Sequence, residues 1–402
     1  MNNQPKIWTK SFISISLTQF LVFIAFYLLL TTLPIYVINN LDGSEAEGGL
    51  VVTVMLIAAI IVRPFSANLL DKVGKKKGLV GSVSIFTATT FLYIWVDSLT
   101  PLLFIRFFHG LSFGVITTAT GAIAADIIPA SRKGAGLGYF AMAMNLAVVV
   151  GPFIGLSLLQ FVSFKTVFII LSIIMVTGVF CSMLVQVSPG TENMDTKPAK
   201  KFSIHQLIEV KAIPIALISS IVSLSYASII SFISVYADSL GLASAASFFF
   251  LVFAVVMILS RPSFGRAFDT KGPRIVIIPC LLIFAVGLIV LSFTQTALLL
   301  LVAAGLIGLG YGTLLPSFQT MSIQTASVAR SGHATATFFM LYDAGIALGS
   351  FIWGAVVAGF GFKNLYLICA ALVVITAILF NFYYTKANKK QNVARKAAVE
   401  NY

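Results

Sequence analysis

Three ionisable side chains lie within long apolar stretches of this chain: Asp343, Arg106 and His109. A charged, unpaired carboxylate inside a membrane is costly, so Asp343 is expected to be protonated or partnered there. Arginine keeps its proton, whereas histidine titrates near neutral pH. We therefore expect these three residues to couple proton movement to transport: Asp343 by binding and releasing a proton, His109 by relaying one, and Arg106 as a fixed charge that needs acceptors. Two plainer interpretations stay open: Asp343 as a neutral hydrogen-bonding group between helices, and His109 as a donor to a neighbouring helix.

Arg106 and His109 are three residues apart, which places them on one face of a helix. Asp343 stands apart from the other acidic residues, because those fall at or beyond the ends of the apolar stretches. It lies about ten residues into its stretch, roughly 15 Å deep at the helical rise per residue. A carboxylate at this depth in a membrane span is a candidate functional group.

The composition requires lipid as the solvent. Hydrophobic residues make up 59% of the 402 residues and charged residues 10%, against about 25% charged in a typical soluble domain. Apolar runs of about 20 residues predict membrane-spanning helices. We expect an all-α integral membrane protein with twelve helices, at 12–38, 48–70, 78–97, 101–125, 135–160, 165–187, 212–237, 244–268, 275–294, 297–321, 333–359 and 363–385.

The net charge of +13 is explained by topology, so no nucleic-acid partner is expected. With the amino terminus inside, nearly all Lys and Arg residues fall on the cytoplasmic side, and only Lys165 and Lys363 fall in outer loops. This is the distribution that the positive-inside rule describes. It predicts a multi-pass protein of the cell membrane with both termini in the cytoplasm.

A repeat divides the chain into two halves. Arg63-Pro64-x6-Asp71-x2-Gly74 returns 198 residues later as Arg261-Pro262-x6-Asp269-x2-Gly272. Six helices per copy give the halves the same orientation, a recognised plan for transporters. We expect a six-helix half at 1–187, a cytoplasmic linker at 188–211, a second six-helix half at 212–386 and a basic cytoplasmic tail at 387–402.

The repeated segment itself predicts a conformational latch. Its glycine permits a sharp turn after a helix, and its carboxylate lies beside basic residues that can hold neighbouring helices. A solvated turn is the plainer interpretation. The predicted latch residues are Arg63, Asp71, Gly74, Lys75, Arg261, Gly265, Asp269 and Gly272.

This loop pattern resembles the signature of the major facilitator superfamily. Arg106-x2-His109-Gly110-x3-Gly114 is similar to that superfamily's helix 4 motif, with His109 where Gln is commoner. Gly151-Pro152-x2-Gly155 looks like the helix 5 motif of twelve-helix drug:proton antiporters, although Ala147 and Leu156 replace two of its glycines. The resemblance implies that this helix packs across the interface between halves. Ordinary small-residue packing explains the glycines equally well.

The resemblance also implies a substrate site. In the superfamily, helices 1, 4, 7 and 10 line a central cavity, and Asn145 occupies the repeat position of Asp343. The implied substrate-binding residues are Gln19, Phe23, Tyr27, Asn145, Ser223, Tyr226, Tyr311 and Gln319. Arg106 matches the superfamily's helix 4 arginine, which is implicated in proton coupling.

These observations predict a secondary active transporter that exports small, amphipathic molecules in exchange for protons by alternating access. The alternative is a symporter or uniporter of the same fold for a specific metabolite such as a sugar, an amino acid or a metallophore. An enzyme is not expected, because no cluster of nucleophile, base and acid is present. We expect a monomer driven by the proton gradient, without cofactor or metal, since Cys181, Cys280 and Cys369 lack ligand-like spacing.

Overall fold

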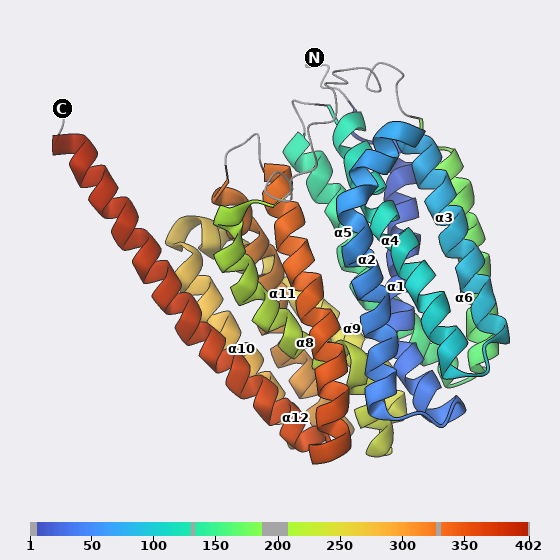
Figure 1. Ribbon diagram of the computed structural model, residues 1–402. Coiled ribbons are helices and arrows are strands. Elements are labelled where there is room, and N and C mark those ends of the chain that lie inside the picture. The colour runs from blue at the N-terminus through green and yellow to red at the C-terminus, as the bar shows by residue number, and fades with distance from the viewer. Residues whose placement is uncertain (1–5, 130–132, 187–207, 327–330, 401–402) are drawn as a thin grey trace. The chain divides into compact units, whose positions relative to one another are not determined.

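The computed structural model describes residues 6–129, 133–186, 208–326 and 331–400 (Figure 1). Most of the predicted linker at 188–211 lies outside these residues, as do the side chains of 387–402 in the predicted tail. The long helices are α1 (Lys10–Asn40), α2 (Glu45–Val73), α3 (Lys75–Leu92), α4 (Leu99–Ile127), α5 (Lys133–Leu159), α6 (Phe164–Met183), α8 (Ile213–Ser239), α9 (Ala243–Lys271), α10 (Pro273–Ser292), α11 (Ala297–Gln324) and α12 (Ser331–Glu400). Short 3₁₀ helices, η1 (Tyr93–Trp95) and η4 (Val210–Ala212), follow α3 and precede α8.

Eleven helices of the described chain are long and apolar enough to cross a membrane. The difference from the predicted twelve lies in α12, which contains the predicted spans 333–359 and 363–385. Gly361 interrupts this helix with φ 74°, and Figure 1 shows the sharp turn there. Only glycine adopts such a conformation without steric cost. The last two predicted spans are therefore joined directly at one glycine, with no loop between them.

The predicted turns after α2 and α9 are confirmed. Gly74 has φ 91° and Gly272 has φ 88°, so both use the left-handed region that the repeat's glycine was expected to provide. The N–H of Gly74 donates to the carbonyl of Leu70, and that of Gly272 donates to Phe268. These bonds end each helix by using one of its last free carbonyls. The same local geometry therefore occurs in both copies.

Glycine contacts repeat with the sequence. In the first half a Cβ at Gly110 of α4 would collide with the carbonyl of Met55 on α2. In the second half a Cβ at Gly308 of α11 would collide with the carbonyl of Phe253 on α9. Both pairs are related by the 198-residue offset. The missing side chains let the two helix backbones approach closely, which is how small residues pack membrane helices.

The described chain divides into two compact units. Unit 1 comprises Met1–Leu207, Ile229–Leu251 and Ser350–Ala358, and unit 2 comprises Ile208–Ser228, Val252–Gly349 and Gly359–Tyr402. Within unit 1, Ser234 Oγ of α8 donates to the Thr31 carbonyl of α1 at 3.2 Å. Gln160 Nε2 donates to Ser247 Oγ of α9 at 3.1 Å. Unit 1 thus includes one part each of α8, α9 and α12, and the other parts of these helices belong to unit 2.

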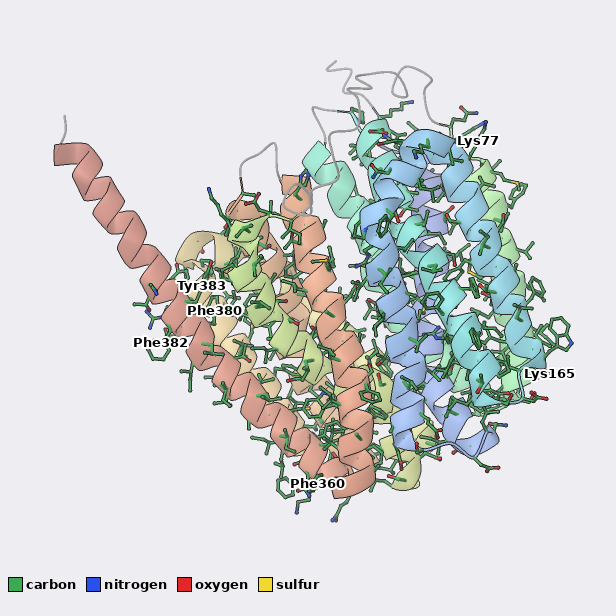
Figure 2. All side chains as sticks on the ribbon, viewed as in Figure 1. Lys77, Lys165, Phe360, Phe380, Phe382 and Tyr383 are labelled. Atoms are coloured by element: carbon green, nitrogen blue, oxygen red, sulfur yellow. The ribbon has the colours of Figure 1, made fainter. Side chains whose placement is uncertain are left out.

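Lys77 and Lys165 lie at opposite ends of the helices of unit 1, as Figure 2 shows. The sequence places Lys77 on the cytoplasmic side and Lys165 in an outer loop. Their separation is what that orientation requires, and the orientation itself stays a prediction from charge distribution.

Candidate functional site

An aromatic stack joins α1 and α4 in the first half. The rings of Phe26 and Phe113 are parallel within 5°, with centroids 4.5 Å apart. Phe23 packs its edge against Phe113 at 5.3 Å, and Tyr27 lies beside Phe26. Such stacked and edge-on pairs are favourable arrangements for aromatic rings. The predicted residues Phe23 and Tyr27 thus belong to one aromatic group at the α1–α4 contact.

The second half contains the equivalent stack, built from tyrosines. Tyr226 of α8 and Tyr311 of α11 are parallel within 11°, with centroids 3.8 Å apart. Tyr311 is the repeat partner of Phe113 by the 198-residue offset. Phe253 and Phe284 pack around this pair at 6.2 and 5.5 Å. The structure therefore brings two predicted substrate-binding residues into direct contact.

Glycine contacts show that Tyr226 also has an equivalent position in the first half. A Cβ at Gly151 would meet the carbonyl of Ile24 on α1, and one at Gly349 would meet the carbonyl of Leu224 on α8. Since Gly151 and Gly349 are repeat partners, α1 and α8 correspond with an offset of 200 residues. This offset pairs Phe26 with Tyr226.

A third tyrosine completes what we call the tyrosine cluster: Tyr226, Tyr311 and Tyr342. The hydroxyls of Tyr311 and Tyr342 are hydrogen-bonded to each other, and Tyr342 is buried on α12. The Tyr226 hydroxyl is also buried and has no hydrogen-bond partner among the described residues. A buried phenol normally has such a partner. The tyrosine cluster therefore holds a free donor inside the second half.

Asp343 immediately follows Tyr342 and is partly buried. Its carboxyl interacts electrostatically with the Tyr342 hydroxyl. Among the described acidic side chains it alone lies in the middle of a membrane span, as the sequence predicted. Its repeat partner Asn145 is on α5, and the side chain of Asn145 lies outside the described residues.

Ser223 and Gln319 take different places around the tyrosine cluster. Ser223 Oγ donates to the Tyr342 carbonyl at 2.8 Å, so it joins α8 to α12 beside Asp343. Gln319 is half-buried on α11, eight residues and about two turns beyond Tyr311. In the first half, Gln19 accepts a hydrogen bond from Thr120 at 2.6 Å, which joins α1 to α4.

Arg106 is completely buried in the first half, at 0% exposure. Its Nε donates to the Val51 carbonyl of α2 at 3.1 Å. Its Nη1 and Nη2 have no hydrogen-bond partner among the described residues. A buried guanidinium needs acceptors, because it stays charged. The Tyr93 hydroxyl is near enough to interact with this guanidinium, so Arg106 and Tyr93 belong to one buried polar group.

His109 faces α3 and η1. Its Nδ1 lies 2.9 Å from the Tyr93 hydroxyl and its Nε2 lies 3.5 Å from Thr90 Oγ1. Thr90 already donates its one hydrogen to the Phe86 carbonyl at 2.8 Å, so it can only accept from the histidine. Nε2 then carries the hydrogen and Nδ1 accepts from Tyr93. These bonds fit a neutral imidazole.

The glycines of the helix 5 motif pack within the first half. Gly151 lies against α1 at Ile24, and Gly155 lies against Leu28 of the same helix. The resemblance implied packing across the interface between halves. The residue of this segment that contacts a second-half ring is Phe153, whose centroid is 6.4 Å from that of Phe248 on α9. Pro152 is inside α5 between the two glycines.

An ion pair links the predicted latch to α4. Lys75 Nζ lies 2.5 Å from Asp126 Oδ2, and both side chains are 24% exposed. Asp126 is one of the acidic residues expected at or beyond the ends of the apolar stretches, so its pairing with Lys75 was not predicted. Its repeat partner is Gln324, and that of Lys75 is Pro273. The ion pair is therefore a feature of the first copy only.

The other predicted latch residues lie around the same turns. Asp71 and Asp269 are exposed in the last turns of α2 and α9. Arg63 and Arg261 are partly buried about two turns earlier, and Arg261 Nη2 contacts Met257 Sδ at 4.0 Å. Gly265 is exposed with open space where a side chain would project.

Comparison with known proteins decides the family, because the sequence profile of the Major Facilitator Superfamily matches residues 15–274 and 215–400. The chain belongs to the Major Facilitator Superfamily. It is 27% identical over 386 residues to the multidrug resistance protein MdtG of Klebsiella pneumoniae strain 342, covering 93% of each chain. It is 25% identical over 393 residues to MdtG of Escherichia coli, covering 94% of this chain and 95% of that one.

Solved structures share the fold. The nucleoside transporter NupG superimposes with a TM-score of 0.72 at 16% identity, over 94% of this chain and 99% of that chain. A variant of the peptide transporter POT superimposes with a TM-score of 0.77 at 14% identity, over 94% of both. This superfamily member is therefore an all-α, multi-pass membrane transporter of small molecules and not an enzyme.

Proposed function

We propose that this superfamily member exports amphipathic small molecules in exchange for protons, with Asp343 as the coupling group. The proposal depends on one observation above all: an acidic side chain in the middle of a membrane span, beside the buried tyrosine cluster. It is supported by the relatives named multidrug resistance protein MdtG.

The coupling follows from the cost of charge in a buried site. Asp343 is stable there when neutral, or when charged and partnered. A substrate that supplies hydrogen-bond donors or positive charge favours the ionised carboxylate, so its binding releases a proton. Proton binding in turn favours substrate release. This reciprocal linkage gives exchange of one for the other across the membrane.

The aromatic groups of both halves suit an apolar or amphipathic substrate. Phe23, Phe26, Tyr27 and Phe113 supply ring surface from α1 and α4, and Gln19 supplies an amide. Pockets with large ring area and few polar groups bind such compounds with limited selectivity. Tyr226, Tyr311, Ser223, Gln319 and Asn145 are the second set of proposed substrate contacts.

Arg106 is the second proposed coupling group. Its Nη1 and Nη2 lack hydrogen bonds of good geometry among the described residues, so they can hold water or an acceptor on a substrate. The bonds of His109 to Tyr93 and Thr90 favour the plainer interpretation, in which its neutral ring joins α4 to α3 and η1. The turn at Gly74 and the Lys75–Asp126 ion pair are proposed to hold α2, α3 and α4 in one conformation until the transporter changes state, and the turn at Gly272 is proposed to do the same for α9 and α10.

Uptake of ethidium, an amphipathic fluorescent dye, into inverted proteoliposomes tests the proposal. An imposed gradient, acidic inside, should drive accumulation, and a protonophore should abolish it. Equal accumulation with and without the gradient would contradict proton exchange and indicate a uniporter. If neither ethidium nor any of a panel of amphipathic dyes is transported, while a single metabolite is transported, the exporter proposal fails.

A further inference from the structure

The aromatic stacks of the two halves differ by hydroxyl groups. Phe26, Phe113 and Met144 of the first half correspond to Tyr226, Tyr311 and Tyr342 of the second. The first stack forms without any of these hydroxyls, with its rings parallel within 5°. Packing alone therefore does not require tyrosine at these positions. The added hydroxyls need another explanation.

The hydroxyls are arranged so that a hydrogen bond can point in either direction. Tyr311 and Tyr342 are bonded to each other through groups that can each donate or accept. Either Tyr342 donates to Tyr311 or Tyr311 donates to Tyr342. In a buried site of low dielectric constant, the nearest change of charge decides between these two arrangements.

That change of charge is available at Asp343. An ionised Asp343 attracts the Tyr342 hydrogen, and Tyr342 then accepts from Tyr311. A neutral Asp343 leaves Tyr342 free to donate to Tyr311. Among the described residues, the other titratable groups that interact with Tyr342 are two phenols, Tyr311 on α11 and Tyr226 on α8. The rings of Phe253 on α9 and Phe284 on α10 pack against Tyr311.

We infer that Tyr342 is a positioning residue that transmits the charge state of Asp343 on α12 to Tyr311 on α11. Tyr226, stacked on Tyr311 at 3.8 Å, extends this contact to α8. Protonation would thereby change the bonds between three helices that all contribute proposed substrate contacts. The inference rests on the proposed role of Asp343 as the coupling group.

Infrared difference titration of the full-length protein in liposomes tests this inference without any substrate. The protonated carboxyl of Asp343 is identified as the band that Asp343→Asn removes, and its intensity is followed against pH. Tyr342→Phe keeps the ring and deletes only the hydroxyl. We expect the midpoint to move to higher pH, because the ionised carboxylate loses its favourable interaction with the nearby hydroxyl dipole. An interaction of this kind corresponds to about a five-fold change in proton concentration, or ~0.7 pH unit.

A double substitution tests transmission through Tyr342. Tyr311→Phe, which introduces the first half's residue, should shift the midpoint in the wild-type background but not in the Tyr342→Phe background. Tyr384→Phe removes the same group near the far end of α12 and should leave the midpoint unchanged. Thermal unfolding of each variant shows whether it has folded.

The two possible failures are distinguishable. If no band sensitive to Asp343→Asn titrates, Asp343 does not exchange a proton and the proposed function fails. If that band titrates normally but its midpoint is the same in Tyr342→Phe, the positioning role is overturned while the proposed function survives. Equal shifts of Tyr311→Phe in both backgrounds would also overturn transmission through Tyr342.

Discussion

Phe113 and Tyr311 occupy equivalent positions in the two halves, and each is stacked under an aromatic ring from the adjacent helix of its own half. The shared part of this relationship is the packing of α1 on α4 and of α8 on α11. The difference is the hydroxyl, which in Tyr311 is bonded to Tyr342 beside Asp343. The duplicated fold thus carries a polar site in one copy where the other copy is apolar.

Gly110→Ala should destabilise the protein, because the new methyl group would collide with the Met55 carbonyl of α2. Overpacking of this kind costs about 1–3 kcal/mol. The melting temperature in detergent should fall relative to wild type. Gly121→Ala in the same helix is the matched control, since open space surrounds that position. A Gly110→Ala protein as stable as Gly121→Ala would contradict the close α2–α4 contact.

His109→Gln should preserve proton-driven transport to within about two-fold. A glutamine oxygen can accept from Tyr93 and its amide can donate to Thr90, which reproduces the two bonds of the neutral ring. His109→Leu should lower stability, because it leaves the buried Tyr93 hydroxyl without this partner. Initial rates of dye transport under a pH gradient measure the effect. Loss of coupling in a well-folded His109→Gln protein would instead identify His109 as a proton relay.

Lys75→Asp and Asp126→Lys should each slow transport, and the double substitution should restore much of the rate. Each single change places like charges where the structure has an ion pair of 2.5 Å. Because both side chains are partly exposed, the pair is worth only about 0.5–1 kcal/mol. We therefore expect conformational populations to shift by about two- to five-fold, with little change in melting temperature. Lys77→Asp, at an exposed neighbouring position, is the control. Failure of the double substitution to recover would argue against a direct pair.

The sequence was sufficient for most of the fold, because the signals for it are local. Apolar runs marked the membrane helices to within a few residues, and the repeat's glycine predicted the turns at Gly74 and Gly272. The direct joining of two spans at Gly361 was missed. The composition around Gly361 does not distinguish a loop from a direct turn between two helices. The difference depends on the backbone angles of this glycine, which the sequence does not specify.

The candidate site was predicted only in part. Asp343 could be found from sequence because its isolation in an apolar span is a one-dimensional feature. Tyr342 and Asp126 were missed, because their importance comes from Tyr311 and Lys75, which are distant in sequence. A comparison of the repeats would have indicated Tyr342, since Met144 is its partner. The hydrogen bonds of His109 to Thr90 of α3 and Tyr93 of η1 were not predicted either, because they depend on how these helices pack.

Proton movement through Asp343 is the central claim, and dye-evoked proton flux in proteoliposomes with an internal pH indicator measures it directly. Ethidium added to wild-type protein should evoke a pH change, and Asp343→Asn should abolish it while ethidium binding to the purified protein persists. Asp238→Asn, an equivalent change in the exposed last turn of α8, should behave as wild type. Proton flux in Asp343→Asn at the wild-type rate would contradict the account.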